Sequence, residues 1–345
     1  MVLIPRSRYW LRRLLRKPAA FAFGTALLLG AGAASLPARA LEPLTVGVVI
    51  WTGYGPFYVA DALGFWKQRK LKVRLQVFAD PALIPPAMAG RAVDGGVITY
   101  DQVLGADAKG QQLAVVLPVD YSDGGDAIVA ATSIRSLADF KGERIAFNAL
   151  SPSDFLLSYA LSTQGLSEKD IVSADMTPEA IPSALVSGRV RIGVTYEPFV
   201  SQLTAQGGGK AFRVIYSSHD APGLIADVLA FDRQQIAAHP AEIRALLEGY
   251  FDGLAYMKQN PQKAAQIMAK FMGISAGEVL AQMHGMHNPD RTEMLVNLSR
   301  SSAKTSFASS GEVIGRILKA KGQISQVPAF EQTVDDEFLR TLAPR

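Results

Sequence analysis

Residues 44–117 alternate between short apolar runs rich in β-branched residues and stretches whose apolar positions recur at helical spacing. The runs have the length of strands, and the stretches between them have the length of crossover helices. This alternation predicts a parallel sheet with helices on its faces. The predicted strands are Leu44–Ile50, Val73–Phe78, Gly95–Ile98 and Leu113–Leu117. The predicted helices are Pro56–Phe65, Pro81–Ala89 and Gln102–Lys109.

The same alternation starts again near residue 127 and continues to residue 216. Its predicted strands are Ala127–Ala131, Arg144–Phe147, Ile171–Ala174, Ile192–Thr195 and Phe212–Tyr216, and its predicted helices are Leu137–Phe140, Asp154–Gln164, Glu179–Ser187 and Pro198–Ala205. From Val228 onward the spacing of apolar residues predicts a helical block. Two α/β units in series predict two lobes, and we expect the helical block to pack back onto the first. The predicted boundaries are 41–122 and 226–345 for lobe 1 and 123–225 for lobe 2, with two crossing segments between them.

The N-terminal segment 1–40 has the features of an export signal. It carries seven basic residues and no acidic one, then an apolar run over Ala19–Ala34, and small residues at the A-x-A spacing in Ala38-Arg39-Ala40. This order is typical of a cleavable secretory signal. The run is shorter than the roughly 20 residues that span a bilayer, which makes a retained anchor the less favoured alternative. We therefore expect a periplasmic protein, and Arg12-Arg13 leaves the twin-arginine route open beside the general secretory route.

Composition excludes several classes of protein. With 49% hydrophobic and 19% charged residues, the 345-residue chain is too apolar to be disordered. The lack of cysteine excludes disulfides, thiolate metal sites, iron–sulfur clusters and a cysteine nucleophile. The net charge of +4 comes from the export signal, because without its seven basic residues the chain has 28 basic and 31 acidic residues. The basic isoelectric point is therefore no evidence for nucleic-acid binding.

Several predicted helices begin with a capping residue followed by proline, as at Asp80-Pro81, Ser151-Pro152, Thr177-Pro178 and Glu197-Pro198. Such caps are ordinary helix starts and explain most of these residues without a function. The functional alternative is that these turns surround a ligand, because ligands of open α/β sheets bind beyond the carboxyl ends of the strands. The turns also hold aromatic side chains suited to enclosing a small molecule: Trp51, Tyr54, Tyr100, Tyr121 and Tyr196.

The charged residues at these turns are mostly acidic: Asp80, Asp101, Asp120, Asp123, Asp154, Glu197, Asp220 and Asp227. Basic residues are nearly absent from the turns, and Arg191 lies at a strand edge. This distribution favours a ligand with a cationic or N–H donor end over a bare inorganic anion. Glu197 is the strongest single candidate for contact with such a group, although the helix dipole alone also favours a carboxylate there.

No catalytic or metal-binding motif is complete. Ser301-Ser302-Ala303-Lys304 contains an S-x-x-K without its usual partner motifs. The acidic, glycine-rich segment Asp120–Asp126 lacks the spacing and the final glutamate of a calcium loop. His284 and His287 have no other histidine nearby in the sequence with which to form a zinc site. We therefore predict a binding protein without catalytic residues, cofactor or metal.

Six segments, taken in order, carry a family resemblance: Trp51–Trp66, Gly90–Gly96, Asp120–Val129, Leu137–Ala146, Val194–Pro198 and Asn260–Met272. The first has the pattern W-x-G-Y-x-P-F-Y, and the fifth contains a Y-E-P turn. In this order they resemble the periplasmic solute-binding proteins of the nitrate/sulfonate/taurine class of ABC importers. The resemblance covers most of the chain after residue 40. It departs at Arg191, where the family commonly has aspartate.

This resemblance implies a type II periplasmic binding protein, in which two Rossmann-like lobes joined by two crossing segments close on a small solute. It also implies docking on an inner-membrane permease. The solutes of the family range from nitrate to sulfonates, amines and heterocycles, and the acidic turns favour a taurine-like zwitterion or a nitrogen-rich ring. A related branch that makes a thiamine pyrimidine uses a cysteine-rich iron site, which a chain without cysteine lacks. The open alternatives are a periplasmic enzyme and a sensory receptor adaptor on the same two-lobe fold.

We expect both lobes to contribute residues to the ligand site. The expected ligand-binding residues are Trp51, Thr52, Tyr54, Tyr100, Asp101, Ser151, Asp154, Glu197 and Asp227. The expected partners are a small solute and the permease, with no nucleic acid. We expect a monomer, because capture requires two lobes that are free to move.

Overall fold

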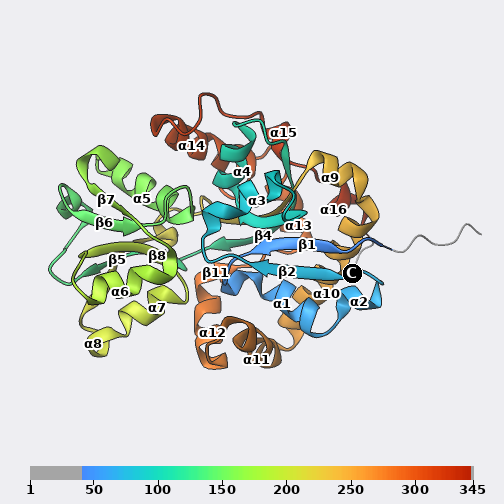
Figure 1. Ribbon diagram of the computed structural model, residues 1–345, viewed down its shortest axis with the longest axis horizontal. Coiled ribbons are helices and arrows are strands. Elements are labelled where there is room, and N and C mark those ends of the chain that lie inside the picture. The colour runs from blue at the N-terminus through green and yellow to red at the C-terminus, as the bar shows by residue number, and fades with distance from the viewer. Residues whose placement is uncertain (1–40, 343–345) are drawn as a thin grey trace, which may run out of the picture. The chain divides into compact units, whose positions relative to one another are not determined.

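Two β-sheets organise the chain in the computed structural model, which describes residues 41–342 (Figure 1). The predicted export signal at 1–40 lies outside the described residues. Sheet A has the strand order β11-β4-β10-β3-β1-β2, formed by β1 (Leu44–Val48), β2 (Val73–Val77), β3 (Gly95–Thr99), β4 (Leu113–Ser122), β10 (Ala226–Asp232) and β11 (Met286–His287). Sheet B has the order β7-β6-β8-β5-β9, formed by β5 (Asp126–Ala131), β6 (Arg144–Phe147), β7 (Val172–Asp175), β8 (Ile192–Tyr196) and β9 (Phe212–Ser217).

Helices cover both sheets. Those between strands are α1 (Gly55–Ala62), α2 (Phe65–Gln68), α3 (Ile84–Ala89), α4 (Tyr100–Asp107), α5 (Pro152–Thr163), α6 (Ile181–Val186), α7 (Phe199–Thr204) and α8 (Gln206–Gly209). The later ones are α9 (Arg233–Ala238), α10 (Pro240–Gln259), α11 (Pro261–Met272), α12 (Ala276–Gln282), α13 (Arg291–Asn297), α14 (Phe307–Ala320), α15 (Phe330–Thr333) and α16 (Glu337–Thr341). Within residues 41–342, no helix has both the length and the apolar character needed to cross a bilayer.

The expectation of a helical chain from Val228 onward is wrong at its start, because Ala226–Asp232 forms strand β10. Val228, Leu229, Ala230 and Phe231 are completely buried, so this strand has no polar face and no alternation to distinguish it from a helix. The strand lies between β3 and β4 and runs antiparallel to both. The chain leaves sheet A at the end of β4 and re-enters it at the start of β10. Both points lie on the same side of the sheet, so β10 must run in the direction opposite to β4.

The expected parallel sheet is therefore a mixed one. In sheet A, β1 is parallel to both β2 and β3, while β10 is antiparallel to its neighbours. In sheet B, β6 is parallel to β7 and β8, and β5 is antiparallel to β8 and β9. Strand β5 enters sheet B from the side on which β8 ends, which gives the same reversal of direction as in sheet A.

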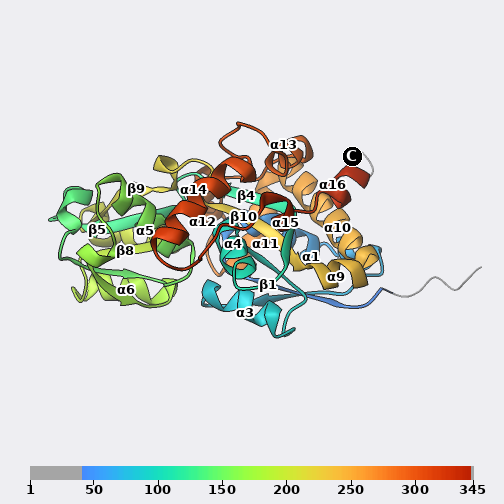
Figure 2. The ribbon, with the colours of Figure 1, turned by 90° about the horizontal axis from the view of Figure 1, so that it is seen from above.

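Two crossing segments connect the sheets, as the sequence predicts. The chain passes from β4 to β5 through Asp123–Gly125 and returns between β9 and β10. The two crossings are bonded to each other: the Ser122 amide donates to the Ile225 carbonyl at 3.0 Å, and the Ser122 and Ser218 hydroxyls lie 2.8 Å apart. Helix α14 makes a further connection, because it packs against α4 beside sheet A and against α5 beside sheet B (Figure 2).

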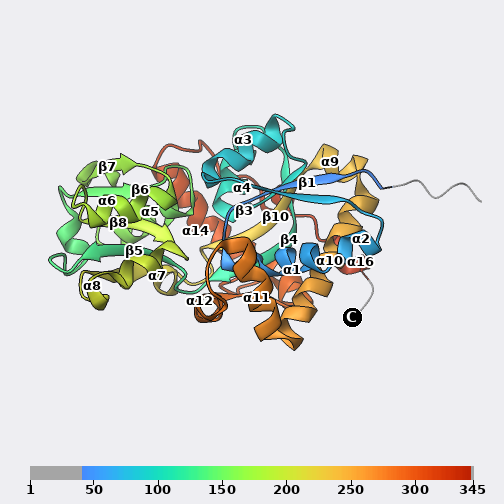
Figure 3. The same cartoon turned by 60° about the horizontal axis from the view of Figure 1, so that its bottom comes forward.

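Helices α1 and α10 pack closely on one side of sheet A, with α11 and α12 beside them (Figure 3). Two glycines of α10 permit this approach. A Cβ atom at Gly253 would lie 2.1 Å from the Pro56 carbonyl oxygen, and one at Gly249 would lie 2.1 Å from the Trp66 ring. The missing side chains thus bring α10 close to the segment that carries the aromatic turn after β1.

Replacing Gly253 with alanine should destabilise the protein by about 2 kcal/mol, because the new methyl group would clash with the Pro56 backbone. This sign is informative, since alanine in a helix interior is otherwise favoured over glycine by about 1 kcal/mol. Urea denaturation followed by circular dichroism would measure the change. The matched control is Gly277→Ala in α12, where a Cβ would meet only the Ser275 hydroxyl, at 3.9 Å. A Gly253→Ala protein as stable as the control variant would contradict the packing described here.

Candidate ligand-binding site

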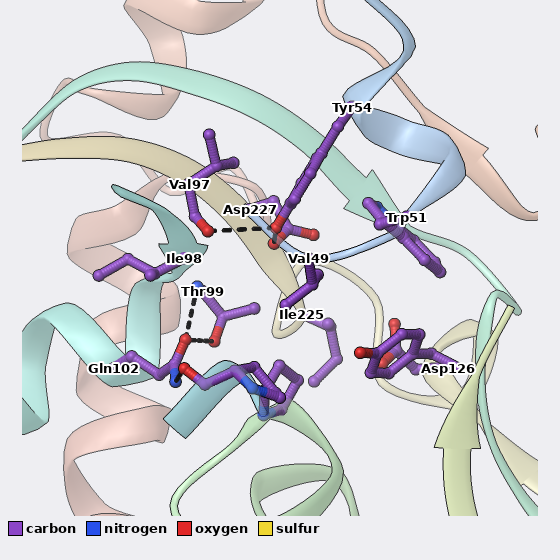
Figure 4. A pocket seen from close by; sticks show the side chains of 13 residues that line it. Val49, Trp51, Tyr54, Val97, Ile98, Thr99, Gln102, Asp126, Ile225 and Asp227 are labelled. Atoms are coloured by element: carbon purple, nitrogen blue, oxygen red, sulfur yellow. Dashed lines mark hydrogen bonds between the residues drawn. The ribbon is translucent and has the colours of Figure 1, made fainter. Parts of the chain in front are cut away.

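A small cavity lies where the central strands of both sheets end (Figure 4). From the sheet A side it is lined by Val49, Trp51, Tyr54, Pro81, Val97, Ile98, Thr99, Gln102, Ile225 and Asp227, and from the sheet B side by Asp126, Pro152 and Tyr196. Its volume is about 20 Å³, which is room for roughly one water molecule. A larger solute does not fit this cavity in the arrangement seen here.

Two carboxylates from neighbouring strands lie at the site, Asp227 in the lining of the cavity and Asp120 beside it on the adjacent strand. Asp227 of β10 lies directly opposite Asp120 of β4, next to an irregularity where β10 passes Pro118. A proline in a central strand cannot donate to the ladder, so such an irregularity is expected there. Like charges directly opposite each other destabilise a sheet. This cost is reduced here, because burial and the neighbouring Asp227 raise the pKa of Asp120, so the two groups do not both ionise readily.

Aromatic side chains hold these two carboxylates in place. The Tyr54 hydroxyl donates to Asp227 Oδ1 at 2.6 Å, and the Trp51 indole N–H donates to the two Asp120 carboxylate oxygens at 3.1 and 3.2 Å. Gly53 is required beside them, because a Cβ there would lie 2.1 Å from Asp120 Oδ2. The aromatic turn after β1 therefore positions both carboxylates, and its Trp51 and Tyr54 side chains line the cavity.

Sheet B contributes a third carboxylate and a facing aromatic ring. Asp126 opens β5 and lies opposite Tyr196 at the end of β8. The Tyr196 ring meets the Trp51 ring edge to face, with centroids 5.9 Å apart and planes at 88°. This contact joins the two sides of the cavity. The site thus combines acidic groups and flat apolar surfaces from both.

Burial disfavours the ionised form of these carboxylates and raises their pKa values. It raises the pKa of Asp126 to about 7, even though a hydrogen bond with Ser122 favours the charged form. Burial and mutual repulsion raise the pKa of Asp120, and burial also raises that of its neighbour Asp227. Among the described residues that line the cavity, none is lysine, arginine or histidine. A cationic ligand would supply the positive charge that the lining of this cavity lacks.

A sequence model of the NMT1/THI5-like family matches residues 51–264, which is more than half of the chain. The chain belongs to the NMT1/THI5-like family. A relative from Brucella abortus named "Putative binding protein" is 22% identical over 279 residues, covering 79% of this chain and 86% of its own. The alkanesulfonate-binding protein of Xanthomonas axonopodis bound to MOPS superposes with a TM-score of 0.69 at 17% identity, covering 85% of this chain and 96% of its own.

These superpositions confirm the predicted periplasmic-binding-protein fold for this family member. The desulfurization enzyme DszB also superposes, with a TM-score of 0.61 at 15% identity, covering 87% of this chain and 98% of its own. At these identities the likeness concerns the fold alone. Both binding proteins and an enzyme use this fold, so the choice between them must come from the residues of the site.

The raised pKa values predict how the stability of this NMT1/THI5-like protein depends on pH. A carboxylate with a raised folded-state pKa stabilises the fold below its unfolded pKa of about 3.9, and this stability is lost as the pH rises through the folded value. Other carboxylates, such as Glu168 and Glu278, have a lowered pKa, and their contribution to folding stability is complete at lower pH. We expect the melting temperature of the ligand-free protein to fall between pH 5 and pH 8.

The variant Asp126→Asn should flatten this dependence, because it removes a group whose pKa is about 7. The loss in the native chain is about 1.4 kcal/mol per unit of pKa shift. Differential scanning calorimetry in buffers of equal ionic strength would measure it. A melting temperature that rises from pH 5 to pH 8 in the ligand-free protein would show that these carboxylates are not buried as described.

Of the predicted ligand-binding residues, Trp51, Tyr54 and Asp227 line this cavity. Thr52 faces away from it, because its hydroxyl donates to Gln282 Oε1 at 2.7 Å. Tyr100 also packs elsewhere: its ring stacks on Phe307 with centroids 4.5 Å apart. Asp101, Ser151 and Asp154 line a second cavity. The structure therefore does not bring all nine residues to one place, and their roles as ligand contacts remain predictions.

Glu197, the strongest candidate from the sequence, is bonded to the helix that follows it, α7. Its carboxylate accepts from the Ser201 amide at 3.0 Å and from the Ser201 hydroxyl at 2.7 Å. Burial raises its pKa. The peptide bond to Pro198 is cis. The two hydrogen bonds to Ser201 are those expected of a carboxylate at a helix start. This is the non-functional alternative that the sequence left open.

Sequence reasoning did not include Asp126, Thr99 or Gln102 among the predicted site residues. Asp126 belongs to the acidic segment that the sequence analysis interprets as a crossing segment and compares with a calcium loop, without a role in ligand binding. Among residues 41–342, no group of three or more acidic or histidine side chains is placed to hold a metal ion. The available signal for Asp126 was its position at the start of a strand immediately after a crossing segment, where a side chain faces the boundary between the two sheets.

Proposed function

We propose that this protein is a periplasmic solute-binding component of an ABC importer and that its solute is a small nitrogen compound with a cationic or N–H donor group. The observation that carries this proposal is a cavity with Asp126 and Asp227 in its lining, Asp120 opposite Asp227 on the adjacent strand, and no basic side chain in the lining. The fold supports capture between two lobes, with residues 41–122 and 226–345 as one lobe and residues 123–225 as the other. The export signal expected from the sequence supports the periplasmic location.

Binding would proceed by closure of the lobes around the solute. The cavity has room for about one water molecule, and in the proposed mechanism the lobes separate to admit the solute and then close around it. In the closed state Trp51 and Tyr196 would enclose the apolar part of the solute. Asp126 and Asp227 would accept hydrogen bonds from its nitrogen atoms, and the permease would receive it from this state. Ligand favours closure only by its additional affinity for the closed form.

An anionic solute fits the site less well. The Xanthomonas relative binds alkanesulfonate, but a sulfonate in this cavity would face carboxylates without a basic side chain to balance its charge. Bringing like charges together in a buried site is unfavourable. A taurine-like zwitterion would place its ammonium group well and its sulfonate poorly. We therefore propose an amine, amidine or amino-heterocycle in preference to nitrate or a simple sulfonate.

A thermal-shift screen of the purified protein tests the proposal. The panel would contain amines, guanidines, amino-heterocycles, taurine, alkanesulfonates and nitrate. A ligand at 100 times its dissociation constant stabilises the fold by about 2.7 kcal/mol. We expect saturable shifts with nitrogen cations and none with nitrate. Shifts confined to alkanesulfonates or nitrate would contradict the proposal, and chemical conversion of a stabilising compound during incubation would favour the enzyme alternative.

A further inference from the structure

A second cavity lies beside the first, between the helices of sheet A and the start of α5. It is lined mainly by small and apolar residues, among them Pro85, Ala106, Leu150 and Leu318. Its volume is about 380 Å³, compared with about 20 Å³ for the first cavity. The second cavity is therefore large enough for several atoms of a ligand in the arrangement seen here, and the first is not.

Asp101 supplies an unsatisfied carboxylate oxygen in the wall of this second cavity. The residue is 5% exposed, and its Oδ1 atom has no hydrogen-bond partner among the described residues. A buried acceptor without a partner carries a free-energy cost that a donor from a ligand would remove. Burial raises the pKa of Asp101 to about 6, even though hydrogen bonds from Thr99 and the backbone to the carboxylate favour its charged form, so the group is mostly ionised at neutral pH.

The other charged groups on this wall are already paired or exposed. Asp154 is bonded to Lys321 and accepts from the Gln323 amide at 3.2 Å. Lys109, the basic residue in the lining, is exposed and is not among the groups that shift the pKa of the buried Asp101. Asp101 is thus the charged side chain that a ligand in this cavity would meet.

Gln102 separates the two cavities and lines both. Its amide nitrogen donates to the Pro81 carbonyl at 3.1 Å and to the Leu150 carbonyl at 3.3 Å. Pro81 lies on the sheet A side and Leu150 on the sheet B side, so separation of the lobes would break the bond to Leu150. Asp101 is also close enough to the first cavity that its charge raises the pKa of Asp126 and Asp227.

We propose that the solute is a dication: one cationic nitrogen meets Asp126 and Asp227, a short apolar chain passes Gln102, and a second cationic nitrogen meets Asp101. This inference rests on the function proposed above and narrows its solute class. It assigns a use to the second cavity and to the unpaired oxygen of Asp101. It also gives Gln102 a role as a movable partition between two halves of one binding cleft.

Isothermal titration calorimetry with matched amines tests this inference. The diamines run from 1,3-diaminopropane to 1,6-diaminohexane, and each is compared with the monoamine of equal chain length. The expected result is that the best diamine binds about tenfold or more tightly than its monoamine, as one added charge-assisted hydrogen bond implies. In Asp101→Asn this preference should disappear, so that the diamine and its monoamine bind with affinities within about twofold of each other.

Two further variants keep the test decisive. Asp107→Asn, on the same helix but outside the lining, should retain the preference for diamines. Gly105→Leu should remove the preference by filling the second cavity, and it should fold because a Cβ at Gly105 meets nothing within 4 Å. Equal affinity of the native protein for diamines and monoamines, or a preference that persists in Asp101→Asn, would overturn the dication proposal alone. Binding of neither class would overturn the dication proposal, and the absence of a shift with every nitrogen cation of the thermal-shift panel would overturn the proposed function as well.

Discussion

The variant Asp126→Asn is expected to bind a cationic solute about 100-fold more weakly than the native protein. Asp126 lines the first cavity, is nearly completely buried, and has no basic side chain in the cavity to compensate its charge. Removing one member of a buried charge pair costs about 2–5 kcal/mol, most of which appears as a faster off-rate. The amide retains the size of the carboxylate, so the loss would report charge and not shape. Titration calorimetry at pH 8, where Asp126 is mostly ionised, measures the effect.

The variant Asp227→Asn provides the matched comparison. Asp227 lies opposite Asp120, and burial and mutual repulsion raise the pKa of Asp120. When the charge of Asp227 is removed, Asp120 ionises more readily and replaces part of it. We therefore expect a smaller loss in Asp227→Asn than in Asp126→Asn. An unchanged affinity in Asp126→Asn, with the variant folded, would remove Asp126 from the binding site.

The variant Lys321→Met is expected to lower the free energy of unfolding by about 3 kcal/mol. Lys321 follows α14 and forms ion pairs with Asp154 of α5 and with Glu168, and its ammonium also donates to the Ser158 hydroxyl at 2.8 Å. Asp154 is 4% exposed. Loss of the lysine would leave an unpaired carboxylate in a site from which water is nearly excluded, and such a group is costly.

The same lysine connects the two lobes. Helix α14 packs on α4 through the stacked rings of Phe307 and Tyr100, while the partners of Lys321 lie beside sheet B. Lys321→Met should therefore also shift the unliganded protein toward an open form, with a larger radius of gyration in solution scattering. The control is Lys319→Met, an exposed lysine of the same helix, for which a change within about 0.5 kcal/mol is expected. Equal stability of the two variants in urea would show that the lysine does not link the lobes.

The sequence identified most strands of both sheets because their apolar runs are short and separated by capped helices. Strand β10 was not predicted, for a physical reason. Val228–Phe231 is buried on both faces, and a short apolar run that does not alternate with polar residues lacks the two-residue period that identifies a strand. Because β10 was not predicted as a strand, part of the candidate ligand-binding site was not predicted either. The cross-strand pair of Asp120 and Asp227 exists only because β10 inserts beside β4, and no local pattern shows which strands will be neighbours.

The placement of the site beyond the strand ends follows from the topology of α/β sheets, and Trp51 and Tyr54 lie there as expected. Side-chain direction was harder to predict. Tyr100, Asp101 and Gln102 are consecutive residues of one helix, and successive helical side chains point about 100° apart. Tyr100 therefore packs against α14, Asp101 lines the second cavity, and Gln102 lines both cavities. Choosing among them requires knowledge of what packs against the helix.

The central claim is that buried carboxylates receive a cationic solute, and proton release on binding tests it most directly. Titration calorimetry of a stabilising amine near pH 7, repeated in buffers with different ionisation enthalpies, counts the protons exchanged. Because the pKa of Asp126 is about 7 and a bound cation would lower it, the account predicts net release of a fraction of a proton. Net proton uptake, or binding with no proton exchange at pH 6, 7 and 8, would contradict it.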